Sequence, residues 1–79
     1  MELQLLDGTF SSNESIEILN KLFQVKIKYH EDKIKTSENE EDVKMREQKI
    51  KYLQNELAHA RQLIATKTGD ISMSSTITL

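Results

Sequence analysis

Residues 9–68 contain neither glycine nor proline, so no strong helix breaker interrupts this long segment. Two helix-start signals lie within it. Ser11 followed by Glu14 fits a capping box, in which a hydroxyl and a carboxylate satisfy unpaired backbone N–H groups reciprocally. Ser37 followed by Glu40 fits the same pattern and opens an acidic stretch suited to the positive end of a helix dipole. The sequence therefore predicts a helix over 12–35, a turn over 36–38 and a helix over 39–67.

Apolar residues in the second helix recur at intervals of seven and then of alternating three and four, which is a heptad stripe. The first helix carries a matching stripe, whose intervals are also threes and fours. Because a short turn joins them, the helices are expected to lie antiparallel. A single register then sets Ile34 opposite Val43 and Ile27 opposite Ile50. The predicted hairpin seam consists of Ile16, Leu19, Phe23, Ile27, His30, Ile34, Val43, Arg46, Ile50, Leu53, Leu57, Ala60 and Ile64.

The stretch LFQVKIKYH, residues 22–30, alternates apolar and polar residues as a strand would. On a helix the same residues divide between the seam and a second apolar stripe, which a lone hairpin leaves uncovered. Helical structure is favoured here over a strand. The expected interface residues on this second stripe are Ile18, Leu22, Val25, Tyr29, Met45, Tyr52 and Leu63.

These patterns predict an all-α, coiled-coil-like antiparallel hairpin that pairs into a dimeric four-helix bundle. Short non-helical segments flank the hairpin: an N-terminal arm over 1–11 and a flexible or strand-like tail over 68–79. Segments ELQLL and ISMSSTITL could pair as strands, but unanchored ends usually fray. Gly69 falls a little beyond the second helix, where a left-handed residue often closes a helix.

The chain has 79 residues, 37% of them apolar, and no cysteine. So small a chain seldom stabilises itself from one core, and disulfides and thiolate metal sites are absent, which favours oligomerisation. A formal net charge of −2 supplies no field for nucleic acid or an anionic membrane. The first ten residues lack the basic and apolar regions of a signal peptide, and no apolar run is long enough to span a membrane. We therefore expect a cytoplasmic protein without membrane contact.

Three features of the sequence could serve as chemical sites. Glu56 and His59 form a Glu-x-x-His sequence that could hold a metal together with Glu17, although the seam rotates His59 away from the hairpin interior. His30 and Arg46 interrupt the two seams opposite one another, where a polar pair fixes register. The first helix carries five lysines that could contact nucleic acid, but adjacent acidic residues oppose this: Lys21, Lys26, Lys28, Lys33 and Lys35.

No nucleophile motif or glycine-rich phosphate loop is present, so no enzymatic activity and no cofactor are expected. The favoured function is a small helical-hairpin protein that associates with itself, most simply as a dimer, and binds another protein. The alternatives are a nucleic-acid-associated regulator that uses the lysines of the first helix and a dimeric metal-carboxylate bundle.

Overall fold

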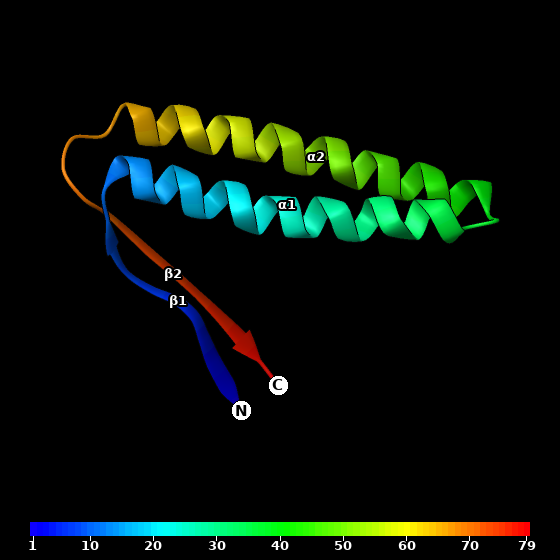
Figure 1. The fold of residues 1–79 in the computed structure, drawn as a ribbon, viewed down its shortest axis with the longest axis horizontal. Coiled ribbons are helices and arrows are strands. Elements are labelled where there is room, and N and C mark those ends of the chain that lie inside the picture. The colour runs from blue at the N-terminus through cyan, green and yellow to red at the C-terminus, as the bar shows by residue number, and fades with distance from the viewer.

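The computed structural model describes residues 1–79 in the order β1 (Glu2–Phe10), α1 (Ser12–Thr36), α2 (Glu40–Ala65) and β2 (Ile71–Thr78). The two helices lie side by side as an antiparallel hairpin (Figure 1). Both strands leave the end of the hairpin at which α1 begins and α2 ends, and they run back beneath the helices at an angle. The predicted helical hairpin is present, and its helices start and end within two residues of the expected positions.

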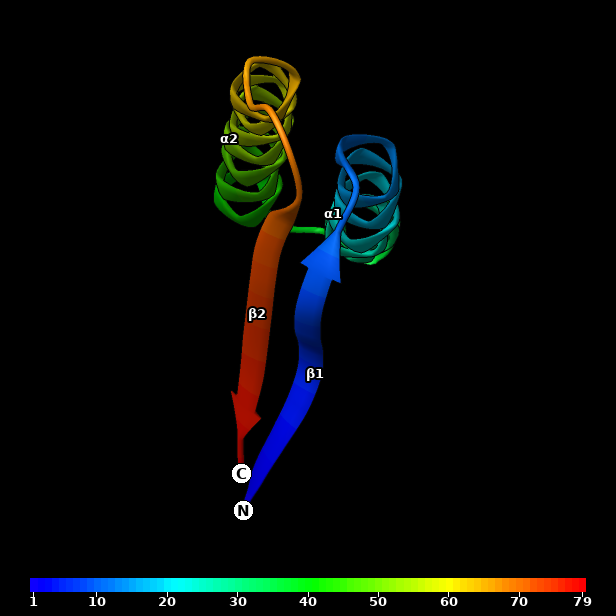
Figure 2. The ribbon, with the colours of Figure 1, turned by 90° about the vertical axis from the view of Figure 1, so that its left-hand side faces the viewer.

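The predicted all-α class is wrong, because β1 and β2 pair into a two-stranded antiparallel sheet. The tail over 68–79, expected to be flexible or strand-like, contains a strand over 71–78. The hairpin reverses the chain and brings the two ends together, so each short segment finds a partner that is remote in sequence (Figure 2). The expected fold is corrected in one further respect: a sheet, which a four-helix bundle does not include, faces one side of the helices.

The capping box at the start of α1 is confirmed. The Ser11 hydroxyl accepts from the Glu14 backbone N–H at 3.1 Å, and the Glu14 carboxylate accepts from the Ser11 N–H at 3.1 Å. The second predicted box is wrong, because Asn39 rather than Ser37 caps α2 and accepts two N–H groups of its first turn. Ser37 instead closes α1. Both residues suit a cap, and the one adjacent to α2 takes the position.

The hydrophobic core is a single line along the hairpin. Only four residues are buried, and three of them, Leu53, Leu57 and Ile64, project from α2 into the seam. The fourth is Ser15, in the first turns of α1. The other ten seam residues are half-buried. The Cα positions span 47 × 33 × 13 Å, so the molecule is about one layer thick rather than the two layers of a typical domain.

The sheet is amphipathic. Residues paired across an antiparallel sheet share a face, and the face toward the helices is apolar except for Gly8 and Ser75, while the opposite face is polar. A register shift between Gln4 and Leu6 marks a bulge in β1. The paired residues on the inner face are Leu3, Leu6, Gly8, Phe10, Ile71, Met73, Ser75 and Ile77. Those on the outer face are Glu2, Gln4, Asp7, Thr9, Ser72, Ser74, Thr76 and Thr78.

Candidate protein interface

An apolar groove of about 530 Å³ lies where the sheet meets the helical hairpin. The sheet contributes Leu6, Ile71 and Met73 to its lining, and serines of β2 complete that side. Three helical residues form the opposite wall: Leu19, Leu22 and Ile64. The groove is open to solvent because the strands diverge from the helices after leaving their shared end (Figure 1).

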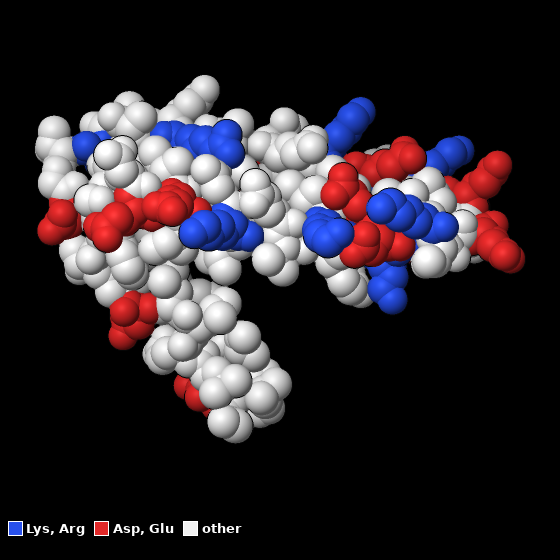
Figure 3. Space-filling view, viewed as in Figure 1, with Lys and Arg blue, Asp and Glu red and all other residues white.

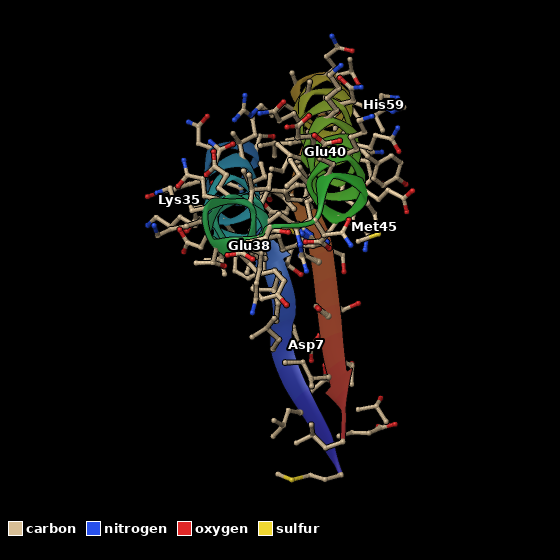
Figure 4. The ribbon with its side chains drawn as sticks, turned by 90° about the vertical axis from the view of Figure 1, so that its right-hand side faces the viewer. Asp7, Lys35, Glu38, Glu40, Met45 and His59 are labelled. Atoms are coloured by element: carbon tan, nitrogen blue, oxygen red, sulfur yellow. The ribbon has the colours of Figure 1, made fainter.

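The predicted second stripe is mostly at the surface. Val25 is 70% exposed and Tyr52 is 62% exposed, and Tyr29, Met45 and Leu63 are also exposed. Met45 points away from α1, on the outer side of α2 (Figure 4). The remaining two residues of the stripe, Ile18 and Leu22, are half-buried, and Leu22 lines the groove beside the sheet.

The far end of the sheet carries a further apolar surface that the sequence analysis did not assign. Leu3, Leu5 and Ile77 are exposed there, together with the terminal residues Met1 and Leu79. The Met1 ammonium donates to the Leu79 carbonyl at 2.7 Å, so the two ends of the chain are held together. The alternation of apolar and polar residues in ISMSSTITL was the available signal, but it identifies an apolar face only once the strand is paired.

A polar cluster occupies the seam near the turn. Nη1 of Arg46 lies 3.1 Å from Nδ1 of His30, and Nε of Arg46 donates to the Asp42 carboxylate at 3.3 Å. Because a guanidinium only donates, the His30 ring must accept at Nδ1 and carry its proton on Nε2. The structure thus places His30 and Arg46 together, and Asp42 is the carboxylate that completes the cluster.

The surroundings of this cluster lower two pKa values. Burial lowers the pKa of the His30 imidazole by penalising its charged form, and the positive charges of Arg46, Lys49 and Lys26 lower it further. The pKa of Asp42 is lowered chiefly by a hydrogen bond from Ser37 and then by Arg46. A neutral histidine beside a paired arginine and carboxylate is a stable arrangement, so the cluster has the character of a register-fixing contact.

A second interhelical contact was missed by the sequence analysis. Nε of Arg61 on α2 donates to the side-chain oxygen of Asn20 on α1 at 2.8 Å. Neither residue belongs to an apolar stripe, so periodicity gave no signal for this pair. Together with the polar cluster, it joins α1 to α2 by hydrogen bonds at two positions along the hairpin.

The candidate metal residues are not brought together. No group of three or more histidine, cysteine, aspartate or glutamate side chains is placed to hold a metal. Glu17 pairs with Lys21 at 3.4 Å, and Glu56 raises the pKa of Tyr52 by hydrogen bonding to its neutral phenol. His59 points outward from α2, away from α1 (Figure 4).

The lysines of α1 do not form a separate basic face. Lys21 and Lys28 pair with carboxylates one turn away, and Lys26 and Lys33 lie over aromatic rings of their own helix. Positive and negative side chains are intermixed along the helices, while the strands carry no positive side chain (Figure 3). This distribution does not provide the continuous positive surface that a phosphate backbone requires.

Comparisons with protein-family models, curated proteins and solved structures found no match to this chain. Neither helix combines the length and apolar character that crossing a membrane requires.

Proposed function

We propose that this is a small non-enzymatic protein that associates with itself and binds another protein through the apolar surface of its helical hairpin. The observation that carries the proposal is its exposed area of 6223 Å². A compact monomer of this mass exposes about 4,900 Å². The excess of roughly 1,300 Å² is larger than the ~800 Å² that each partner contributes to a standard interface.

The shape of the chain supports the same conclusion. Its radius of gyration is 15.2 Å, against about 11.6 Å for a compact chain of this length. The seam covers one side of each helix, while Val25 and Tyr52 project into solvent with most of their surface exposed. A chain without cysteine needs no oxidising compartment in order to fold, and we propose the cytoplasm as its location.

Light scattering after size exclusion, over a wide range of concentrations, tests self-association directly. The expected result is a mass that rises above the 9.2 kDa of one chain as concentration increases. A mass that stays at 9.2 kDa throughout would contradict this part of the proposal.

Capture of a partner tests the second part. The double variant Val25→Asp with Tyr52→Asp changes only exposed positions and should keep the helical circular dichroism while losing at least tenfold in partner affinity. Gln24→Asp with Gln54→Asp is the matched control, because it adds the same charge at exposed polar positions of the same two helices. Equal partner binding by the two double variants would refute a role for the stripe. Leu22 is a poorer choice, since its half-buried side chain also supports the groove.

A further inference from the structure

We infer that a second copy of this chain adds to the free edge of β2, so that the two sheets join into one four-stranded sheet in the order β1-β2-β2-β1 across a two-fold axis. The inference rests on the proposed self-association and names the surface that carries it. The two-stranded sheet has two open edges, each presenting unpaired backbone N–H and C=O groups.

The two edges differ in a way that selects β2. β1 carries the carboxylates of Glu2 and Asp7 and a bulge at Leu5, and charges and bulges are the features that keep an edge strand from pairing further. β2 has eight residues, none of them charged, no proline and no bulge. Only the edge of β2 is therefore regular and unprotected.

A second β2 strand fits this edge by symmetry. When two identical strands pair antiparallel across a two-fold axis, the numbers of facing residues add to a constant. The apolar residues of β2 all have odd numbers, so they face one another only if that sum is even. The middle of β2 lies between Ser74 and Ser75, so full overlap of the two strands sets one of these serines on the axis. A small uncharged side chain then faces its own copy there. With Ser75 central, Met73 faces Ile77 and Ile71 faces Leu79, so the apolar inner faces of both copies become continuous.

This arrangement also accounts for the exposed tip of the sheet. The two-fold axis is perpendicular to the joined sheet, so both helical hairpins lie on its apolar face. Antiparallel pairing sets the tip of each arm, with Leu3 and Ile77, beside the end at which the partner's strands enter its hairpin. Two-stranded sheets are marginally stable in water, whereas a four-stranded sheet with an apolar face against helices meets the ordinary requirement for stability.

Charge placed on the outer face of β2 tests the inference. Ser74→Lys with Thr76→Lys leaves the apolar inner face unchanged and brings ammonium groups close to their copies across the axis, which disfavours cross-strand pairing. The expected result in light scattering is a dissociation constant of the dimer at least tenfold higher than that of the unmodified chain. The matched control is Gln4→Lys with Thr9→Lys, which adds the same charge to the outer face of the sheet on β1. It should leave the dissociation constant of the dimer unchanged.

Single cysteines provide a second test that does not require a variant to disrupt anything. Because the chain has no cysteine, any disulfide formed by Ser74→Cys or Ser75→Cys joins two copies. Mild oxidation should cross-link one or both of these variants efficiently at low protein concentration, and should not cross-link the β1 control Thr9→Cys.

The outcomes separate this inference from the proposed function. If the unmodified chain is a dimer, but the β2 and β1 lysine variants dimerise equally and no β2 cysteine cross-links, self-association stands and the β2 edge is refuted. If the chain is a monomer at every concentration, both are refuted, and a strand from a different protein becomes the candidate for that edge. Circular dichroism of each variant confirms that the helical hairpin is retained.

Discussion

Truncating Leu57 and Leu63, two leucines on the same helix, should have very different effects on stability. Leu57 is 7% exposed and lies in the seam, whereas Leu63 is 51% exposed on the second stripe. Leu57→Ala removes a fully buried side chain and leaves a cavity, and we expect it to lower the free energy of unfolding by about 3 kcal/mol. Leu63→Ala removes side-chain area that is already half in water, and its expected cost is about 1 kcal/mol.

The loss predicted for Leu57→Ala is large relative to the total free energy of unfolding. A chain of this length has a typical unfolding free energy of about 4–12 kcal/mol, so Leu57→Ala removes a quarter or more of it. Expressed as melting temperature, 3 kcal/mol corresponds to a fall of about 12–24 °C, and 1 kcal/mol to about 4–8 °C. Urea denaturation followed by circular dichroism measures both variants, at a protein concentration low enough for the single chain to predominate.

Comparison of the two variants isolates the effect of position, because the chemical change is identical. Equal losses for Leu57→Ala and Leu63→Ala would show that the seam does not run where the structure places it. A large loss at Leu63 that appears only at high protein concentration would instead show that association buries the second stripe.

Three further perturbations have defined outcomes. Ser15→Ala should raise the melting temperature by about 4–8 °C, because the Ser15 hydroxyl is fully buried without a hydrogen-bond partner; a fall would show that a partner exists. Stability should decline as pH falls below about 6.5, because the unfolded chain protonates His30 before the folded chain, whose pKa is lowered. His30→Gln should flatten this dependence in pH-resolved melts, with the exposed His59→Gln as the control, and an unchanged slope would refute the assignment. Gly69→Ala should cost about 1 kcal/mol in urea denaturation, because Gly69 adopts φ +89°, and no loss would show that this turn relaxes freely.

The helical half of the fold could be predicted because its signals are local. Heptad intervals, a capping box at Ser11 and a short turn each depend on residues within one or two helical turns of one another. The cap of α2 was misassigned because Ser37 and Asn39 are both competent, and only the length of the turn decides between them. The polar contact of Arg61 with Asn20 lies outside every stripe, so no periodicity revealed it.

Pairing of ELQLL with ISMSSTITL as strands was open from the sequence, but local signals did not favour it over frayed ends. Each strand has an apolar face, but the bulge at Leu5 breaks the alternation in β1, and serine and threonine dilute it in β2. Pairing also depends on a partner more than sixty residues away, which the hairpin supplies only after it has formed. The groove and the exposed tip of the sheet follow from that pairing, so the sequence did not predict them. The exposed stripe on the helices was predictable from helical periodicity.

Pairing of the two chain ends has a consequence for the order of folding. Pairing β1 with β2 by diffusion alone would close a loop of about sixty residues, 11–70, at a high entropic cost. The helical hairpin closes through a turn of only three residues, 37–39. The hairpin is therefore expected to form early and to act as a template that delivers both strands to the same place. A circular permutant that joins residue 79 to residue 1 and opens the chain between α1 and α2 would turn the sheet into a local hairpin. Such a chain would have a lower contact order, and its two strands would pair before the helices have packed together.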